Sequence, residues 1–328
     1  MELQKLLFRR VRSRIPAHLA AENEVAKLLS ISLEEAFKLM RCVSAISLDQ
    51  AEKLAATYSI ALDNLRPQSP TFLPFQYNAI NYNMSSLEEY FDSVMDEIKN
   101  IDLYGTRQLY YAASDLPVFA LFQFAELSAF KLFYWGKHVY DLPAFSDAKF
   151  AIRHFPQESL ASAERSWKQY LKIPSVEVWS SEVINNILRE VFTLWQRGEF
   201  LYRSDALLIC DQIGEMIDHI AAQAACGKKF HPYMPLPTKE NYTLYYNEIG
   251  INNNALLVRS DTGTTAYVCQ NELNFLHTEN EIYCLQTQRW FFQLMGNSEL
   301  ISQTNTELRE RVFAQMHQNV AYVKAQIK

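Results

Sequence analysis

The chain has 328 residues, of which 49% are hydrophobic and 21% are charged, the balance of a folded protein rather than a disordered one. Its eight glycines and eleven prolines exclude a collagen-like or low-complexity chain and argue against a turn-dense β-barrel. The formal net charge of −6 argues against a protein that binds nucleic acid over its whole surface.

The cysteines and the apolar segments indicate the cellular compartment. Five cysteines without a CxxC pair predict free thiols in a reducing environment. The first residues place a short apolar stretch before the basic residues, the reverse of a secretory signal. Charged residues interrupt the most apolar window, 118–135, which is therefore expected to be a buried helix rather than a membrane span. We expect a cytoplasmic protein.

The composition changes near Arg66. Residues 1–66 hold ten Lys and Arg against eight Asp and Glu, whereas the rest of the chain holds 21 against 29. Pro67, Pro70 and Pro74 follow directly and disfavour helix at the residues before them. We therefore expect a first domain over 1–66, a linker over 67–85 and a larger domain over 86–328.

The first domain is expected to be all-α, because every pattern in it is helical and short. Apolar spacing predicts helices over 22–29, 32–41 and 62–65. Ser32 with Glu35, and Ser47 with Gln50, have the spacing of the capping box that opens a helix.

Two of these helices have the spacing of a helix-turn-helix. Ala26 is small enough to let the second helix cross closely, and residues 30–32 make a tight turn. Ile31 and Ala36 then point back into the core. This arrangement frees the outer face of 32–41 to enter a major groove.

The motif from Glu24 to Arg41 and the helix pattern from Ile46 to Leu65 resemble the lambda-repressor-like (XRE) helix-turn-helix family. More narrowly, residues 8–66 are similar to the BetR-type N-terminal domain of bacterial transcriptional regulators. The resemblance implies an operator-binding domain that works as a two-fold dimer on double-stranded DNA.

The expected DNA contacts come from two helices. The second motif helix is expected to read bases through Ser32, Glu35, Lys38 and Arg41. A basic run just before the motif is expected to sit over phosphates: Arg9, Arg10, Arg12 and Arg14. The alternative for the run is a solvated first helix.

The motif departs from the family at several positions. Cys42 occupies a place that is often glycine, so the left-handed residue that ends the helix is expected to be missing. Related BetR-type helices carry several arginines where this chain has Leu39, with Val43 and Ser44 following. The alternative function is therefore a protein-interaction or signalling module that keeps the fold without binding DNA.

The larger domain is expected to be helix-dominated α+β with a small sheet. Buried strands are predicted at 109–113 and 175–179, and a β-meander or hairpin is predicted over 241–270, with a turn at Asp261–Gly263. Helical patterns cover 86–98, 118–140, 158–171, 181–197, 204–225, 279–294 and 304–326.

No catalytic or metal site is expected in the larger domain. The sequence contains no GxGxxG, GxxxxGK[ST], HExxH or GxSxG motif. Cys226 with His231 lacks the further ligands that zinc needs, and His138 fits a helix end better than a catalyst. The aromatic residues of 119–135 fit a core or a dimer contact, with a small-molecule pocket as the alternative. Five residues lie at strand ends, where binding sites often form: Ser114, Asp115, Trp179, Asn247 and Glu248.

Taken together, these patterns predict a cytoplasmic transcriptional regulator that is not an enzyme and holds no cofactor or metal. Its larger domain is expected to form a homodimer and to respond to a small-molecule or protein effector. We expect no membrane partner.

Overall fold

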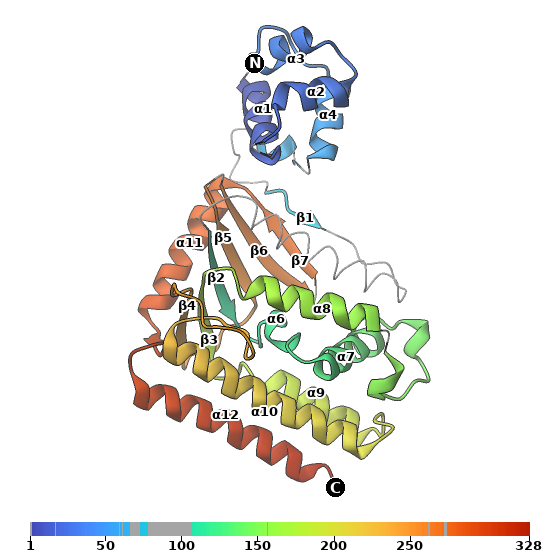
Figure 1. The fold of residues 1–328 in the computed structure, drawn as a ribbon, viewed down its shortest axis with the longest axis vertical. Coiled ribbons are helices and arrows are strands. Elements are labelled where there is room, and N and C mark those ends of the chain that lie inside the picture. Colours follow the sequence, from blue (N-terminus) through green and yellow to red (C-terminus); the bar gives the residue numbers. More distant parts are fainter. Residues whose placement is uncertain are drawn as a thin grey trace. The chain divides into compact units, whose positions relative to one another are not determined.

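The computed structural model describes residues 2–16, 18–58, 60, 62–65, 73–77, 107–155, 157–261, 263–271 and 274–328. These residues form two compact units (Figure 1). The first comprises Met1–Gln76 with Thr278–Cys284, and the second comprises Tyr77–His277 with Leu285–Lys328. Apart from 73–77, the expected linker over 67–85 and the helix expected after Ser86 lie outside the described residues.

The first unit is helical, as the sequence predicts for residues 1–66. Its apolar side chains recur at helical spacing and close into one core, which includes the fully covered Val11, Val25, Ala36 and Leu54. The helices are α1 (Glu2–Arg14), α2 (Ala21–Leu29), α3 (Leu33–Met40), α4 (Leu48–Thr57) and the 3₁₀ helix η1 (Leu62–Leu65).

Side-chain caps begin α3 and α4. The Ser32 hydroxyl accepts a hydrogen bond from the Glu35 backbone N–H at 3.1 Å. Ser47 and Gln50 form the complete reciprocal capping box at the start of α4. After α3, Cys42 adopts a left-handed backbone with φ 58°. The expectation that this left-handed position is missing is therefore wrong, because a cysteine takes the place of the usual glycine.

The second unit is built on an eight-stranded mixed sheet with the order β1-β7-β6-β5-β2-β3-β4-β8. The three neighbouring strands β2, β3 and β4 are parallel, and β5 joins β2 antiparallel. The expected small sheet is therefore an underestimate. The strands are β1 (Gln76–Tyr77), β2 (Gln108–Ala113), β3 (Ser175–Ser180), β4 (Tyr242–Asn247), β5 (Ala255–Arg259), β6 (Thr264–Asn271), β7 (Asn274–Thr278) and β8 (Glu299–Leu300).

Helices connect the parallel strands, as parallel pairing requires. Between β2 and β3 lie α6 (Val118–Leu121), α7 (Ala125–Tyr134) and α8 (Gln157–Tyr170), with the shorter elements η2 (Trp135–Val139), η3 (Pro143–Phe145) and η4 (Ile152–His154). Between β3 and β4 lie α9 (Asn185–Gln196) and α10 (Arg203–Cys226), and α12 (Thr306–Gln326) packs on both. No helix in the described part of the chain is long and apolar enough to cross a bilayer.

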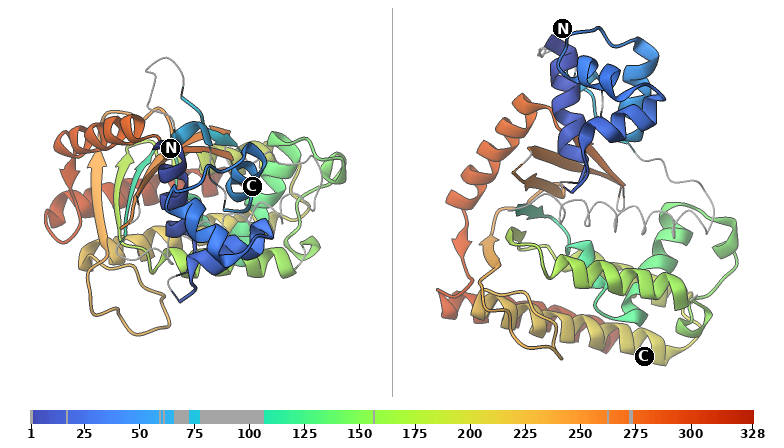
Figure 2. Two further views of the ribbon diagram at one scale, coloured as in Figure 1. Left: turned by 90° about the horizontal axis from the view of Figure 1, so that it is seen from above. Right: turned by 45° about the horizontal axis from the view of Figure 1, so that its top comes forward.

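Both faces of the sheet are covered (Figure 2). On β2, Tyr111 joins the large core formed with α7, α9 and α10. The neighbouring Tyr110 points to the opposite face, where its ring lies 5.8 Å from that of Phe291 in α11 (Glu281–Gly296). The alternation along β2 thus buries consecutive tyrosines in different layers.

The aromatic segment 118–140 is not the single helix that its composition predicts. It divides into α6, α7 and the π-helical turn η2. Phe130 stacks on Phe200 at a centroid distance of 5.9 Å, and Trp135 is 2% exposed. These side chains belong to the core of the second unit.

Candidate nucleic-acid interface

The turn between α2 and α3 places α3 on the core. Ser30 has a left-handed backbone with φ 56°, and the Ile31 N–H donates to the Ala26 carbonyl at 3.1 Å. Ala36 is fully buried and Ile31 packs against the same core, as predicted for both residues. One side of α3 is thereby buried and the other is left to solvent.

The exposed side of α3 is mixed in character. Helical spacing places five residues within one arc of the helix surface: Leu33, Glu34, Phe37, Lys38 and Arg41. Leu33 and Phe37, two large apolar side chains, are 46% and 38% exposed. Sequence reasoning missed both, although the helical period alone places them beside Lys38.

Local partners hold the two basic residues of this face. The Lys38 Nζ lies 2.7 Å from Glu34 Oε1, and this hydrogen bond lowers the pKa of the Glu34 carboxyl. The Arg41 guanidinium lies over the Phe37 ring, 5.8 Å from its centroid. Lys38 and Arg41 therefore share one exposed face, as predicted, but that face also carries a carboxylate.

The other two predicted base contacts are placed differently. The Ser32 hydroxyl already accepts the capping hydrogen bond. Glu35 is exposed on the flank of α3, about a sixth of a turn beyond Lys38 and about a third of a turn from Arg41. The structure therefore groups Lys38 with Arg41 and leaves Ser32 and Glu35 outside that group.

Gln4 of α1 holds the far end of α3. It is a buried polar side chain whose amide donates to the carbonyls of Leu39 and Ser44, both at 2.8 Å. Its carbonyl oxygen accepts from the Ile46 N–H at 3.2 Å. One side chain thus satisfies three backbone groups where α3 ends, which sequence reasoning did not predict.

The arginine run of α1 divides over two sides of the helix. Arg9 and Arg12 lie on one flank of the buried stripe, and Arg10 and Arg14 lie on the other. Arg9 is exposed, whereas Arg12 Nη2 lies 2.9 Å from Glu22 Oε1 of α2. The run is therefore not one continuous basic surface.

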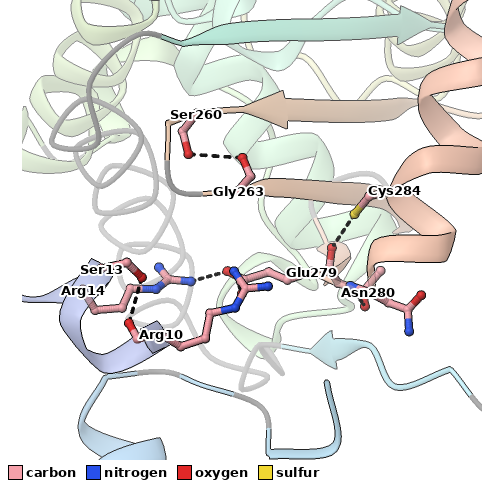
Figure 3. Close-up of polar contacts among 9 residues, drawn as sticks. Arg10, Ser13, Arg14, Ser260, Gly263, Glu279, Asn280 and Cys284 are labelled. Atoms are coloured by element: carbon pink, nitrogen blue, oxygen red, sulfur yellow. Dashed lines mark hydrogen bonds and ion pairs between the residues drawn. The ribbon is translucent and has the colours of Figure 1, made fainter. Parts of the chain in front are cut away.

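Arg10 and Arg14 converge on Glu279, far along the chain (Figure 3). Arg10 Nη1 lies 3.3 Å from Glu279 Oε2, and Arg14 Nη2 donates to Oε1 of the same carboxylate. All three side chains are 31% exposed or less. No sequence signal pointed to Glu279, because 265 positions separate it from Arg14.

His138 and Cys226, the candidates in the sequence for a catalyst and a metal ligand, both contact neighbouring protein groups. His138 Nε2 lies 2.8 Å from a Glu199 carboxylate oxygen, and the Cys226 thiol faces backbone carbonyls at the end of α10. Within the described ranges, no group of three or more His, Cys, Asp and Glu side chains is arranged to hold a metal ion.

The ends of strands β2 and β4 differ. A side chain fills the end of β2, whereas a cleft lies at the end of β4. At the end of β2, Asn254 Oδ1 accepts hydrogen bonds from the Ser114 and Asp115 backbones at 3.0 and 3.3 Å. At the end of β4, Asn247 and Glu248 line an open polar cleft of about 580 Å³ with Arg311 of α12.

Comparison with known proteins identifies no relative of this chain. No family model, no curated protein and no solved structure matches it.

Proposed function

We propose that the chain is a DNA-binding transcriptional regulator of the cytoplasm, as the resemblance of residues 8–66 to XRE and BetR-type domains implies. The first unit contacts duplex DNA, and the second unit dimerises and responds to an effector. The observation that carries the proposal is the turn at Ser30, which leaves a face of α3 with Lys38 and Arg41 uncovered. A helix held in this way fits the major groove.

We propose different roles in DNA binding for α3 and α1. Lys38 and Arg41 are the groups on α3 that can donate to guanine acceptors, and Phe37 can contact a thymine methyl group. Arg9 is exposed on α1 and is available to a phosphate.

The test is selection of bound duplexes from a random pool by the full chain at low salt, followed by affinity measurements on the selected site. Lys38→Ala and Arg41→Ala should each weaken specific binding by about 1–3 kcal/mol. Arg9→Ala should weaken binding to every duplex and reduce the salt slope by about one.

Lys53→Ala is the matched control, because Lys53 is exposed on α4 of the same unit. It should leave specific binding unchanged. Failure of the wild-type chain to retain any duplex at low salt would overturn the proposal.

A protein-interaction module is the second candidate, and exposed apolar residues favour it. Val43 and Leu48 are 72% and 79% exposed near the end of α3, in addition to Leu33 and Phe37. Apolar association depends weakly on salt, whereas phosphate contacts weaken steeply between 50 and 200 mM salt. The salt dependence of the affinity for a captured partner therefore separates a DNA-binding protein from a protein-interaction module.

A further inference from the structure

We propose that Glu279 regulates DNA binding by occupying Arg10 and Arg14 in place of a DNA phosphate. The inference rests on the proposed function. It adds that a carboxylate of the chain itself competes with DNA for two arginines. Glu279 presents one carboxylate oxygen to each guanidinium group (Figure 3). A phosphate offers the same pair of anionic oxygens, so carboxylate and phosphate exclude each other at these two arginines.

Arg10 and Arg14 are one helical turn apart on the same flank of α1. Two guanidinium groups at this spacing can hold one anion between them. Glu279 neutralises part of their charge, and both arginines are less than one third exposed. DNA must therefore displace the carboxylate before it gains these two contacts.

The surrounding backbone holds Glu279 in place. The Thr278 hydroxyl donates to the Pro74 carbonyl at 2.9 Å and accepts from the Asn280 N–H at 3.2 Å. The Asn280 side chain accepts from the Tyr283 N–H at 3.0 Å and so caps the start of α11. Thr278 and Asn280 are both buried. The carboxylate between them is thus preorganised, which lowers the entropy lost in holding the arginines.

The same segment also cancels the basic excess of the first unit. Residues 1–66 carry two more basic than acidic residues, and residues 67–76 carry no charge. Thr278–Cys284 adds Glu279 and Glu281, which makes the unit formally neutral. A displacement of the start of α11 would withdraw Glu279 from Arg10 and Arg14 and increase the positive charge near them. A change in α11 can in this way change the affinity for DNA.

The test compares full-length wild type, Glu279→Gln and Glu281→Gln on a random 30-base-pair duplex between 50 and 200 mM salt. Glu281 is exposed in the first turn of α11, so its substitution removes the same charge without touching the arginines. Glu279→Gln should bind roughly 5- to 30-fold more tightly at the lowest salt, with a salt slope steeper by about one to two. Glu281→Gln should match wild type.

A second variant tests the route through the arginines. In the double variant Arg10→Ala with Glu279→Gln, most of the increase in DNA affinity caused by Glu279→Gln should disappear. The idea fails if Glu279→Gln leaves DNA affinity at the wild-type value, or if Glu281→Gln tightens binding equally. If neither wild type nor any variant binds DNA, the proposed function fails as well. If wild type binds DNA and Glu279→Gln binds no more tightly, only the proposed regulation by Glu279 is overturned. Thermal unfolding of each variant verifies that the chain is folded.

Discussion

At the scale of single residues, the second unit contains a buried charge pair without direct contact. Glu177 of β3 is 1% exposed and accepts hydrogen bonds from Tyr170, Ser175, Trp179 and Tyr242. Lys229 is 2% exposed, and its ammonium lies 3.7 Å from the centroid of the Tyr170 ring. Burial raises the pKa of Glu177, and burial lowers the pKa of Lys229 to about 7.

These two residues are expected to depend on each other for stability. Glu177→Gln leaves Lys229 buried without a counter-charge and should lower the free energy of unfolding by about 3–5 kcal/mol at pH 6. Adding Lys229→Met should recover part of this loss, because no buried cation then remains. Urea denaturation of the wild type, both single variants and the double variant measures the coupling.

The pH dependence gives an independent measure of the Lys229 environment. Between pH 7 and the ordinary value of 10.5, the unfolded chain holds the Lys229 proton and the folded chain does not. Stability of the wild type relative to Lys229→Met should therefore rise with pH in this window. Two results together would contradict the pairing of Glu177 with Lys229. In the first, the effects of Glu177→Gln and Lys229→Met on the free energy of unfolding are strictly additive in the double variant. In the second, the stability difference between wild type and Lys229→Met does not change with pH.

At the scale of elements, local sequence predicted α3 and α4 well because their signals lie within one turn. The Ser32 and Ser47 caps use contacts three residues apart, which the sequence displays directly. The exit from α3 was mispredicted, since the left-handed conformation of Cys42 is imposed by the surrounding structure rather than by its residue type. Gln4 was missed because its partners lie 35 to 42 positions away.

The Gln4 contacts predict a specific effect on the end of α3. Gln4→Leu replaces the amide with an apolar side chain of similar size and removes three hydrogen bonds to backbone groups. It should lower the stability of the first unit by about 2–4 kcal/mol. Hydrogen exchange should show faster exchange at the Ile46 amide, which donates to Gln4.

Ser47→Ala is the comparison for this experiment. It removes a cap of α4, costs about 0.5–2 kcal/mol, and should leave the Ile46 amide less affected than Gln4→Leu does. Unchanged exchange at Ile46 in Gln4→Leu would show that the tether does not hold this segment.

At the scale of the whole molecule, the buried apolar residues that form the core of the first unit lie, among the described residues, between Leu7 and Leu65. Domains of 55–65 residues can fold alone, although with modest stability. We therefore expect the isolated fragment 1–66 to be helical and to unfold cooperatively by circular dichroism. Because it lacks Glu279, it should also bind DNA more tightly than the full chain.

The full-length chain and its Glu279→Gln variant are the references for the fragment. The DNA affinity of fragment 1–66 should fall with salt as steeply as that of the full-length Glu279→Gln variant. An unfolded fragment would show instead that residues 73–76 and 278–284 are needed to complete the unit, since Pro74 and Thr278 are hydrogen-bonded to each other.

By itself, the sequence determined α2, α3 and α4, the N-terminal caps of α3 and α4, the turn between α2 and α3 and the hairpin turn at Asp261–Gly263. All of these depend on residues within a few positions of each other. The tertiary structure decided that β2, β3 and β4 pair in parallel within an eight-stranded sheet, and that Glu279 meets Arg10 and Arg14. Strand partners and distant ion pairs leave no periodic pattern, because chain folding rather than local spacing brings them together.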